Sequence, residues 1–467
     1  MSSGHLPPDK MEEECGIFGV WAPPENSNVS DEIYRGLLAL QHRGQESAGI
    51  SVGSGKTLKT EKGMGLISQV FRAGDLDTMK GSLGIGHVRY STAGSSRLEN
   101  AQPLDVHSKL GDMAVAHNGT LVNAEVLKSL LEDGGVMFRT ESDSEVLLAM
   151  IARRAEKGLE KAVTEAMNAV KGSYALVLAT PDILIGARDP HGIRPMVLGK
   201  RKDRWYLASE SCALTAVGAE TVRDIAPGEV IFINSDGPRS IEQALSSDSA
   251  TCVFEYIYFA RPDSRIDGIS VMEGRLAMGK ELAKEWNADA DIVCGVPDSG
   301  VPAALGFARE SGIPYGMGFM KNHYVGRTFI HPDQEMRERA VSVKLSVLKD
   351  EIEGKRVILI DDSIVRGTTS RRLVSLLRNA GAKEVHFGVV SPPVTSPCYF
   401  GIDTPVAEDL IAHSMDSNDI CKVLGADSLR YLSLEGLKKA LGRESGFCLG
   451  CLTGTYPMPP HQLRGVG

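Results

Sequence analysis

Hydrophobic and polar positions alternate in two different ways along the chain. Between residue 16 and about residue 233, short runs typical of strands lie close together with turn residues between them, at 17–21, 113–116, 174–179 and 230–233. Apolar residues follow helical spacing at 31–41 and 142–170. This clustering of strands favours largely antiparallel sheets packed against helices, which is an α+β layered domain.

The second half of the chain repeats the order strand, loop, helix. Continuous apolar strands are expected at 292–296, 357–360 and 385–390, and helices at 301–310 and 368–380. That alternation predicts an α/β domain with a parallel, doubly wound sheet, which binds ligands at the carboxyl ends of its strands. A polar stretch at 234–250 separates the halves, although Ile241 and Leu245 would allow a short helix in it. We therefore expect two domains, 15–250 and 251–467.

Composition and charge narrow the classes of function. Of the 467 residues, 42% are hydrophobic and 24% are charged, as in globular proteins. The net charge of −9 excludes a global positive field for nucleic acid, so any phosphate must be bound locally. Residues 1–14 contain no apolar block, and no stretch approaches the roughly 20 apolar residues that span a bilayer. We expect a cytoplasmic enzyme with no nucleic-acid or membrane partner.

A loop suited to phosphate is the clearest chemical signal. Residues 357–369 read as a buried strand, the adjacent carboxylates Asp361 and Asp362, a turn through Gly367 and a helix starting near Thr368. Backbone N–H groups and threonine hydroxyls at a helix N-terminus suit a monoester phosphate, while the carboxylates can accept from sugar hydroxyls or hold Mg²⁺. The alternative is a strand end with solvated acids, and the order of the whole segment disfavours it.

This segment resembles the phosphoribosyl-diphosphate loop of the type I phosphoribosyltransferases. The resemblance implies that Asp361 and Asp362 meet the ribose hydroxyls and Mg²⁺, with Ser299 as a further ligand of the metal. It implies that the 5-phosphate lies against Ser363, Arg366, Gly367, Thr368 and Thr369. Residues 296–300 would bind the diphosphate. A flexible lid at 321–328 would cover it, with contacts from Lys321, Tyr324 and Arg327; a solvated loop is the alternative there.

A cysteine precedes the first expected strand. A lone cysteine in such a place, here Cys15, is usually a small core residue. Further segments change that interpretation, namely 41–49, 87–92, 117–119 and 140–145. Together with Cys15 they resemble the glutamine-hydrolysing domain of the N-terminal-nucleophile (Ntn) amidotransferases, over nearly all of residues 15–235.

The Ntn resemblance implies a set of roles. Residues 1–14 would be a propeptide, and its removal would make Cys15 both the nucleophile and, through its α-amino group, the general base. An α-amino group titrates at roughly 7.7–8.0 and can take the proton of the thiol at neutral pH. Asn118 and the backbone of Gly119 would form the oxyanion hole. Arg89 and Asp143 would bind the α-carboxylate and the α-ammonium group of glutamine.

The positions of the cysteines matter more than their number. Eight in 467 residues are too few for a disulfide scaffold. Cys448 and Cys451 form a C-x-x-C pair, whose spacing alone leaves a zinc half-site, a redox pair and a coincidence open.

The order of the two domains resembles the glutamine phosphoribosyldiphosphate amidotransferase family, in its iron–sulfur branch. That resemblance implies a structural [4Fe–4S] cluster held by Cys252, Cys398, Cys448 and Cys451. Cys212, Cys294 and Cys421 would then be packing residues.

The same resemblance implies a reaction in two steps. Glutamine would yield glutamate and ammonia at Cys15, and ammonia would displace diphosphate from 5-phosphoribosyl diphosphate to give 5-phosphoribosylamine. It also implies a homotetramer inhibited by purine nucleotides such as AMP and GMP. Two alternative functions are disfavoured. A glutamine amidotransferase of another type would not require the phosphate loop at 361–369. A non-catalytic regulator would be expected to carry a DNA-binding module and a basic face, whereas the net charge of this chain is −9.

Overall fold

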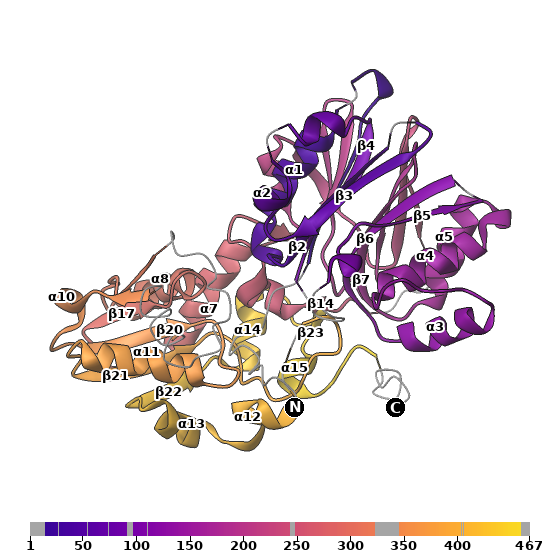
Figure 1. Ribbon diagram of the computed structural model, residues 1–467. Helices are drawn as coiled ribbons and strands as arrows, with labels where there is room; N and C mark the ends of the chain where they lie inside the picture. The colour runs from indigo at the N-terminus through magenta and orange to yellow at the C-terminus, as the bar shows by residue number, and fades with distance from the viewer. Residues whose placement is uncertain are drawn as a thin grey trace.

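The computed structural model describes residues 15–458 except 27, 54, 73, 91–96, 110, 243–247, 323–344, 403 and 405. Within these residues the chain builds two regions with different sheets (Figure 1). Residues 16–242 form two antiparallel sheets, and a parallel sheet lies within residues 292–431. None of the described helices is long and apolar enough to cross a bilayer.

The first region is a sandwich of two antiparallel sheets. One has the order β11-β9-β10-β1-β4-β2-β3, with strands Gly16–Trp21 (β1), Ser47–Gly53 (β2), Leu58–Met64 (β3), Leu83–Arg89 (β4), Val197–Arg201 (β9), Arg204–Ala208 (β10) and Glu220–Asp224 (β11). The other has the order β13-β12-β8-β7-β6-β5, with strands Leu104–Ser108 (β5), Gly111–Leu121 (β6), Gly172–Ala179 (β7), Leu184–Arg188 (β8), Glu229–Asn234 (β12) and Gly237–Glu242 (β13).

Helices cover the outer face of each sheet, which gives four layers. The seven-stranded sheet packs against Ser30–Ala39 (α1), Ile67–Val70 (α2) and Ser211–Ala216 (α6). The six-stranded sheet packs against Ala124–Asp133 (α3), Asp143–Arg153 (α4) and Leu159–Ala169 (α5). Because side chains alternate along a strand, Ile17 of β1 faces the other sheet while Phe18 faces α1. Every residue of β1 is therefore buried.

Two details of the expected elements are different in the structure. The stretch 142–170 is two helices, because Gly158 has a φ of +84° and separates α4 from α5. The short helix allowed around Ile241 is wrong up to residue 242: that segment is strand β13, in which Ile241 pairs with Val230 across a hairpin. Alternation with period two, favoured by burial against β12, decides the conformation there.

The second region is a parallel sheet with helices on both faces, as expected. Its order is β17-β20-β21-β22, with strands Ile292–Gly295, Arg356–Asp361, Glu384–Val389 and Ser428–Tyr431. One face packs against Val271–Glu285 (α7), Gly300–Ser311 (α8) and Leu434–Leu441 (α14). The other face packs against Thr368–Asn379 (α11) and Ser417–Leu424 (α13). Ile358 and Leu359 of β20 lie in different cores, so this strand is apolar on both sides.

Several short elements lie outside these three sheets. Thr251–Cys252 (β14) pairs in parallel with Phe447–Cys448 (β23), and Gly450–Thr453 (α15) follows it between the regions (Figure 1). Arg265–Ile266 (β15) pairs with Ile269–Ser270 (β16), and Phe319–Lys321 (β18) with Leu345–Val347 (β19). Two further short α-helices are Lys349–Ile352 (α10) and Ile411–Ser414 (α12), and Glu255–Phe259 forms a single π-helical turn.

Candidate active sites

The first site lies where several strands of the sandwich end. Gly16 pairs with Val88, so Cys15 and Arg89 meet at the same end of β1 and β4. The thiol of Cys15 donates to the carbonyl oxygen of Tyr90 at 3.6 Å. Asn118 and Gly119 lie in β6, and Asp143 begins α4. The side chains predicted for glutamine chemistry thus come from separate elements of one half of the chain.

Arg89 and Asp143 are both held by neighbouring groups. Arg89 forms an ion pair with Glu46, with Nη1 and Oε1 3.1 Å apart, and its side chain is almost fully buried. Asp143 accepts a hydrogen bond from the backbone N–H of Leu121 at 2.9 Å. Burial opposes the ionisation of the Asp143 carboxyl. His117 and the backbone N–H groups of Leu121 and Ser144 nevertheless hold the pKa of this carboxyl below its usual range. The carboxylate is therefore charged at neutral pH.

Asn118 and Gly119 offer N–H donors in a buried place. Asn118 is 1% exposed, and its side-chain nitrogen has no hydrogen-bond partner among the residues that the structure describes. Gly119 has a φ of +137°, and a Cβ on it would lie 2.1 Å from the carbonyl oxygen of Ser173. Only glycine fits this close approach of β6 and β7. A buried donor without a partner is suited to an atom that becomes negative during a reaction.

The thiol of Cys15 needs a base. Burial raises the pKa of the Cys15 thiol to about 12, although the guanidinium of Arg89 opposes this shift. The thiolate is therefore scarce at neutral pH, and a nucleophilic role requires a group that removes the proton.

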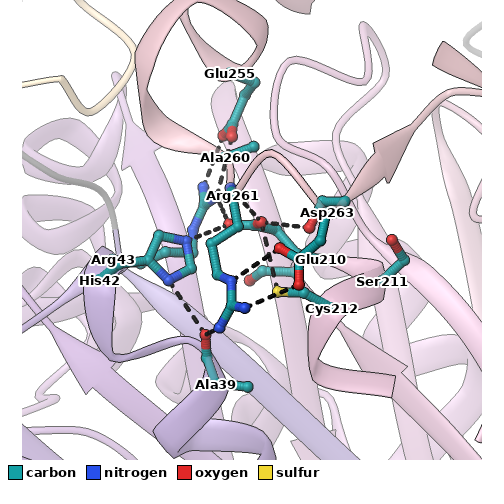
Figure 2. A network of polar contacts seen from close by, with 12 residues as sticks. Ala39, His42, Arg43, Glu210, Ser211, Cys212, Glu255, Ala260, Arg261 and Asp263 are labelled. Carbon is teal, nitrogen blue, oxygen red and sulfur yellow. Dashed lines mark hydrogen bonds and ion pairs between the residues drawn. The ribbon is translucent and has the colours of Figure 1, made fainter. Parts of the chain in front are cut away.

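Arg43 is a further residue of this site, with no role assigned to it from the sequence alone. It is buried, and its Nε donates to the backbone oxygen of Cys15 at 3.2 Å. Its other nitrogens contact Glu210 and Glu255, as Figure 2 shows. The segment 41–49 indicates that Arg43 matters, but these partners lie 167 and 212 positions away, and no local pattern connects them.

The second site lies at the carboxyl end of β20. Asp361 ends this strand, Asp362 follows, and Gly367 with a φ of +84° precedes α11. Both aspartates are fully buried, so the alternative of solvated acids is wrong. Asp362 accepts from the hydroxyl of Ser363 at 2.6 Å and from that of Ser299. The parallel pairing of β17 with β20 brings Ser299 to this position, because the loops after both strands leave the same edge of the sheet.

The predicted lid is described only at its start. The ammonium group of Lys321, at the end of β18, pairs with the carboxylate of Asp298 in the loop after β17. Tyr324 and Arg327 lie outside the described residues. Arg366, in the loop before α11, pairs with Asp409 at 3.2 Å.

Four cysteines gather between the two regions. Cys252 and Cys448 are paired in register between β14 and β23, and Cys451 follows in α15. The N–H of Phe400 donates to the sulfur of Cys398 at 3.3 Å. Burial raises the pKa of the Cys448 thiol to about 12, and the neighbouring Cys398 adds to this shift. Within the described residues, no three Cys, His, Asp or Glu side chains stand at metal-binding spacing.

Comparison with known proteins identifies both regions. A family model described as a glutamine amidotransferase domain matches residues 87–216, and one described as a phosphoribosyl transferase domain matches residues 272–393. The amidophosphoribosyltransferase of Bacillus subtilis strain 168 is 48% identical over 458 residues, which cover 97% of this chain and 96% of that protein. The amidophosphoribosyltransferase of Methanocaldococcus jannaschii is 50% identical over 461 residues, which cover 95% of this chain and 97% of that protein.

A solved structure agrees over the whole fold. The B. subtilis glutamine phosphoribosylpyrophosphate amidotransferase, in complex with ADP and GMP, superposes with a TM-score of 0.90 at 47% identity. The match covers 95% of this chain and 98% of that one. The chain therefore belongs to the amidophosphoribosyltransferase family, which catalyses the first step of purine synthesis from glutamine and phosphoribosyl diphosphate.

Proposed function

We propose that this chain hydrolyses glutamine at Cys15 and uses the ammonia to form 5-phosphoribosylamine at the loop of Asp361 and Asp362. The observation that carries the first half is the buried side-chain nitrogen of Asn118, which has no partner among the described residues and lies in a strand that contacts both β1 and β4. For the second half it is the buried acidic pair at the end of β20, directly before a helix. We divide the chain into a propeptide at 1–14, a glutaminase domain at 15–250 and a phosphoribosyltransferase domain at 251–467.

Cleavage after Glu14 would make Cys15 the first residue of the chain. Hydrolysis of glutamine then begins with a proton transfer within this residue. The free α-amino group of Cys15 takes the thiol proton, and the sulfur attacks the side-chain carbonyl carbon of glutamine. The oxygen becomes negative and accepts from Asn118 and from the backbone N–H of Gly119. Collapse breaks the C–N bond, the amino group returns its proton to the leaving ammonia, and water hydrolyses the thioester to glutamate. Arg89 and Asp143 bind the two charged groups of the amino acid.

Synthesis takes place at the edge of the parallel sheet. Ammonia attacks the anomeric carbon of phosphoribosyl diphosphate, the C–O bond to diphosphate breaks, and the new ammonium group loses a proton to water to give the amine. The 5-phosphate lies at Ser363, Arg366, Gly367, Thr368 and Thr369, and Lys321, Tyr324 and Arg327 contact the diphosphate. Mg²⁺, held by Asp361, Asp362 and Ser299, would neutralise the charge that develops on diphosphate. We also propose a cytoplasmic homotetramer inhibited by purine nucleotides such as AMP and GMP; the relative of known structure carries ADP and GMP.

Replacement of Cys15 tests the assignment. Cys15→Ala is expected to abolish glutamine-dependent synthesis and to change ammonia-dependent synthesis by less than about twofold, because removal of the nucleophile leaves the other site intact. Cys421→Ala is the control, since the Cys421 thiol lies in the other half of the chain, donates to the backbone oxygen of Ala426 at 3.3 Å and has no role in our assignment. Glutamine-dependent product from the Cys15 variant would contradict the proposal.

We further propose that Cys252, Cys398, Cys448 and Cys451 hold a [4Fe–4S] cluster. Four cysteine thiolates are the usual ligands of such a cluster. The N–H of Phe400 donates to the sulfur of Cys398, and hydrogen bonds to cysteine sulfurs help to set the reduction potential of iron–sulfur clusters. The cluster would act structurally, between β14 and the C-terminal segment. Protein prepared without oxygen should contain iron and sulfide in equal amounts, and stoichiometric zinc in their place would overturn the assignment.

A further inference from the structure

The strand that carries Asn118 and Gly119 is held by a side chain of its neighbour β7. Ser173 of β7 is fully buried and pairs in register with Thr120 of β6. The backbone N–H of Thr120 donates to the hydroxyl oxygen of Ser173 at 3.3 Å. This N–H belongs to the peptide unit that directly follows Gly119. The Ser173 hydroxyl therefore fixes the backbone on one side of the glycine whose own N–H we assign to the oxyanion hole.

The hydroxyl of Ser173 is itself oriented by the second half of the chain. It donates to the carbonyl oxygen of Phe400 at 2.7 Å, although the two residues lie 227 positions apart. Phe400 is 1% exposed, and its carbonyl oxygen also accepts from the guanidinium of the buried Arg194. Because the hydroxyl hydrogen points to Phe400, the oxygen of Ser173 presents its lone pairs to the N–H of Thr120. A contact between the two halves thus sets the acceptor for β6.

Gly401 brings the same segment against the backbone of Gly119. Gly401 has a φ of +95°, and a Cβ on it would lie 3.1 Å from the carbonyl carbon of Gly119 and 3.1 Å from the hydroxyl oxygen of Thr120. The carbonyl oxygen of Ser173 approaches Gly119 as well, since it would lie 2.1 Å from a Cβ on that glycine. Gly119 is therefore contacted by backbone from both halves of the chain.

Such contacts give the N–H of Gly119 a fixed direction. A glycine has no Cβ and reaches more backbone conformations than other residues, and Gly119 has a φ of +137°. Donors to a developing negative charge are effective when they are already oriented, because no reorganisation is then needed during the reaction. Ser173 fixes the peptide unit after Gly119, and Gly401 limits the displacement of its carbonyl carbon. Both contacts act on the orientation of the proposed donor.

We infer that Ser173 is a positioning residue for the oxyanion hole of glutamine hydrolysis, and that it is held in place by the segment 400–401 of the second half. The inference rests on the proposed role of Gly119 in this reaction. Ser173 and the segment 400–401 act through Gly119 and not through the substrate. Their effect is therefore on the transition state, in which the amide oxygen is negative, and not on the binding of the amino and carboxyl groups of glutamine.

The first test removes the hydroxyl of Ser173 in the full-length enzyme. Ser173→Ala is expected to lower kcat for glutamine hydrolysis about tenfold, because the N–H of Gly119 remains but loses its fixed orientation. KM for glutamine and the inhibition constant of the product glutamate should change by less than about twofold. Ser51→Ala is the matched control, since Ser51 is also fully buried and its hydroxyl accepts from that of Thr60 at 3.0 Å. This control should leave kcat and KM unchanged.

Three results of this test would overturn the inference. The first is an unchanged kcat in Ser173→Ala, and the second is an equal loss of kcat in Ser51→Ala. The third is a loss that appears in KM and in glutamate binding while kcat is kept, because Ser173 would then serve the binding of the substrate. A failure of the proposed function is distinct, since it would be seen as glutamine-dependent synthesis by Cys15→Ala or as an unchanged kcat in Asn118→Ala.

The second test acts from the other half and covers the case in which Ser173→Ala does not fold. Gly401→Ala places a methyl group against Gly119 and is expected to lower kcat for glutamine hydrolysis at least about fivefold, with ammonia-dependent synthesis changed by less than about twofold. Gly425→Ala is the matched control. Gly425 lies in the same half with a φ of +73°, but a Cβ on it would meet open space among the described residues. Equal losses in the two glycine variants, or an equal loss of both reactions in Gly401→Ala, would overturn the inference.

Discussion

The two sites of this enzyme differ in how the chain assembles them. The proposed glutaminase site draws Arg89 and Asn118 from two strands, Cys15 from the residue before β1 and Asp143 from the start of a helix. Antiparallel register brings Cys15 and Arg89 to the same end of the sheet. The phosphoribosyl site places its two aspartates and its phosphate loop on one continuous segment after β20. The first site therefore depends on long-range packing, and the second depends on one strand, one turn and one helix start. The difference predicts that each site can be damaged without the other.

The largest expected effect is on the phosphoribosyl site. Asp361→Asn and Asp362→Asn are expected to lower synthesis from either nitrogen source by about a thousandfold, because metal contacts are worth several kcal/mol in the transition state. Glutamine hydrolysis measured without phosphoribosyl diphosphate should continue. Asp291→Asn is the control, since Asp291 lies at the opposite end of β17 and pairs with Arg356 at the surface. Synthesis that survives in both aspartate variants would show that these carboxylates do not serve the reaction.

The next effect is on the oxyanion site of the glutaminase half. Asn118→Ala is expected to lower kcat for glutamine hydrolysis by about 100- to 1,000-fold, because one donor to the developing negative charge is lost. Asn123→Ala is the matched control: the Asn123 side chain is occupied by the backbone of Ala169 and Lys171, at 3.0 and 2.8 Å. It should cost about 0.5–1.5 kcal/mol of stability per hydrogen bond with little change in kcat. Steady-state kinetics and thermal unfolding separate the two outcomes.

The smallest effect is a pH dependence that only the glutaminase half should show. The pKa of the Cys15 thiol is raised to about 12 by burial, so its proton must go to a base. If that base is the α-amino group, kcat/KM for glutamine rises with pH through roughly 7.7–8.0, since the base must be unprotonated to accept the proton. Activity then falls about tenfold for each pH unit below that range. A profile that stays level down to pH about 6 would indicate a base of lower pKa.

More of the phosphoribosyl site than of the glutaminase site could be predicted from the sequence, because the first lies on one continuous segment and the second depends on long-range packing. The segment 357–369 predicts a strand, an acidic pair and a helix start from local rules alone, and the structure has these three features. That the helix start binds an anion stays a prediction. The burial of Asp361 and Asp362 was not predictable, because it depends on α8 and the loop of Ser299 packing beside β20. For Cys15, local rules indicated only a small core residue, and a family resemblance supplied its role. Glu210 and Glu255 are isolated acids in the sequence and gain meaning only when the fold surrounds Arg43 with them.

The central claim is that two independent sets of residues carry the two half-reactions. It is tested most directly by mixing the Cys15→Ala and Asp361→Asn enzymes with glutamine and phosphoribosyl diphosphate, and measuring 5-phosphoribosylamine at alkaline pH, where free ammonia is abundant. We predict no product from either variant alone and a clear signal from the mixture, because the Asp361 variant releases ammonia that the Cys15 variant uses. Product from the Cys15 variant alone, or none from the mixture, would contradict the account.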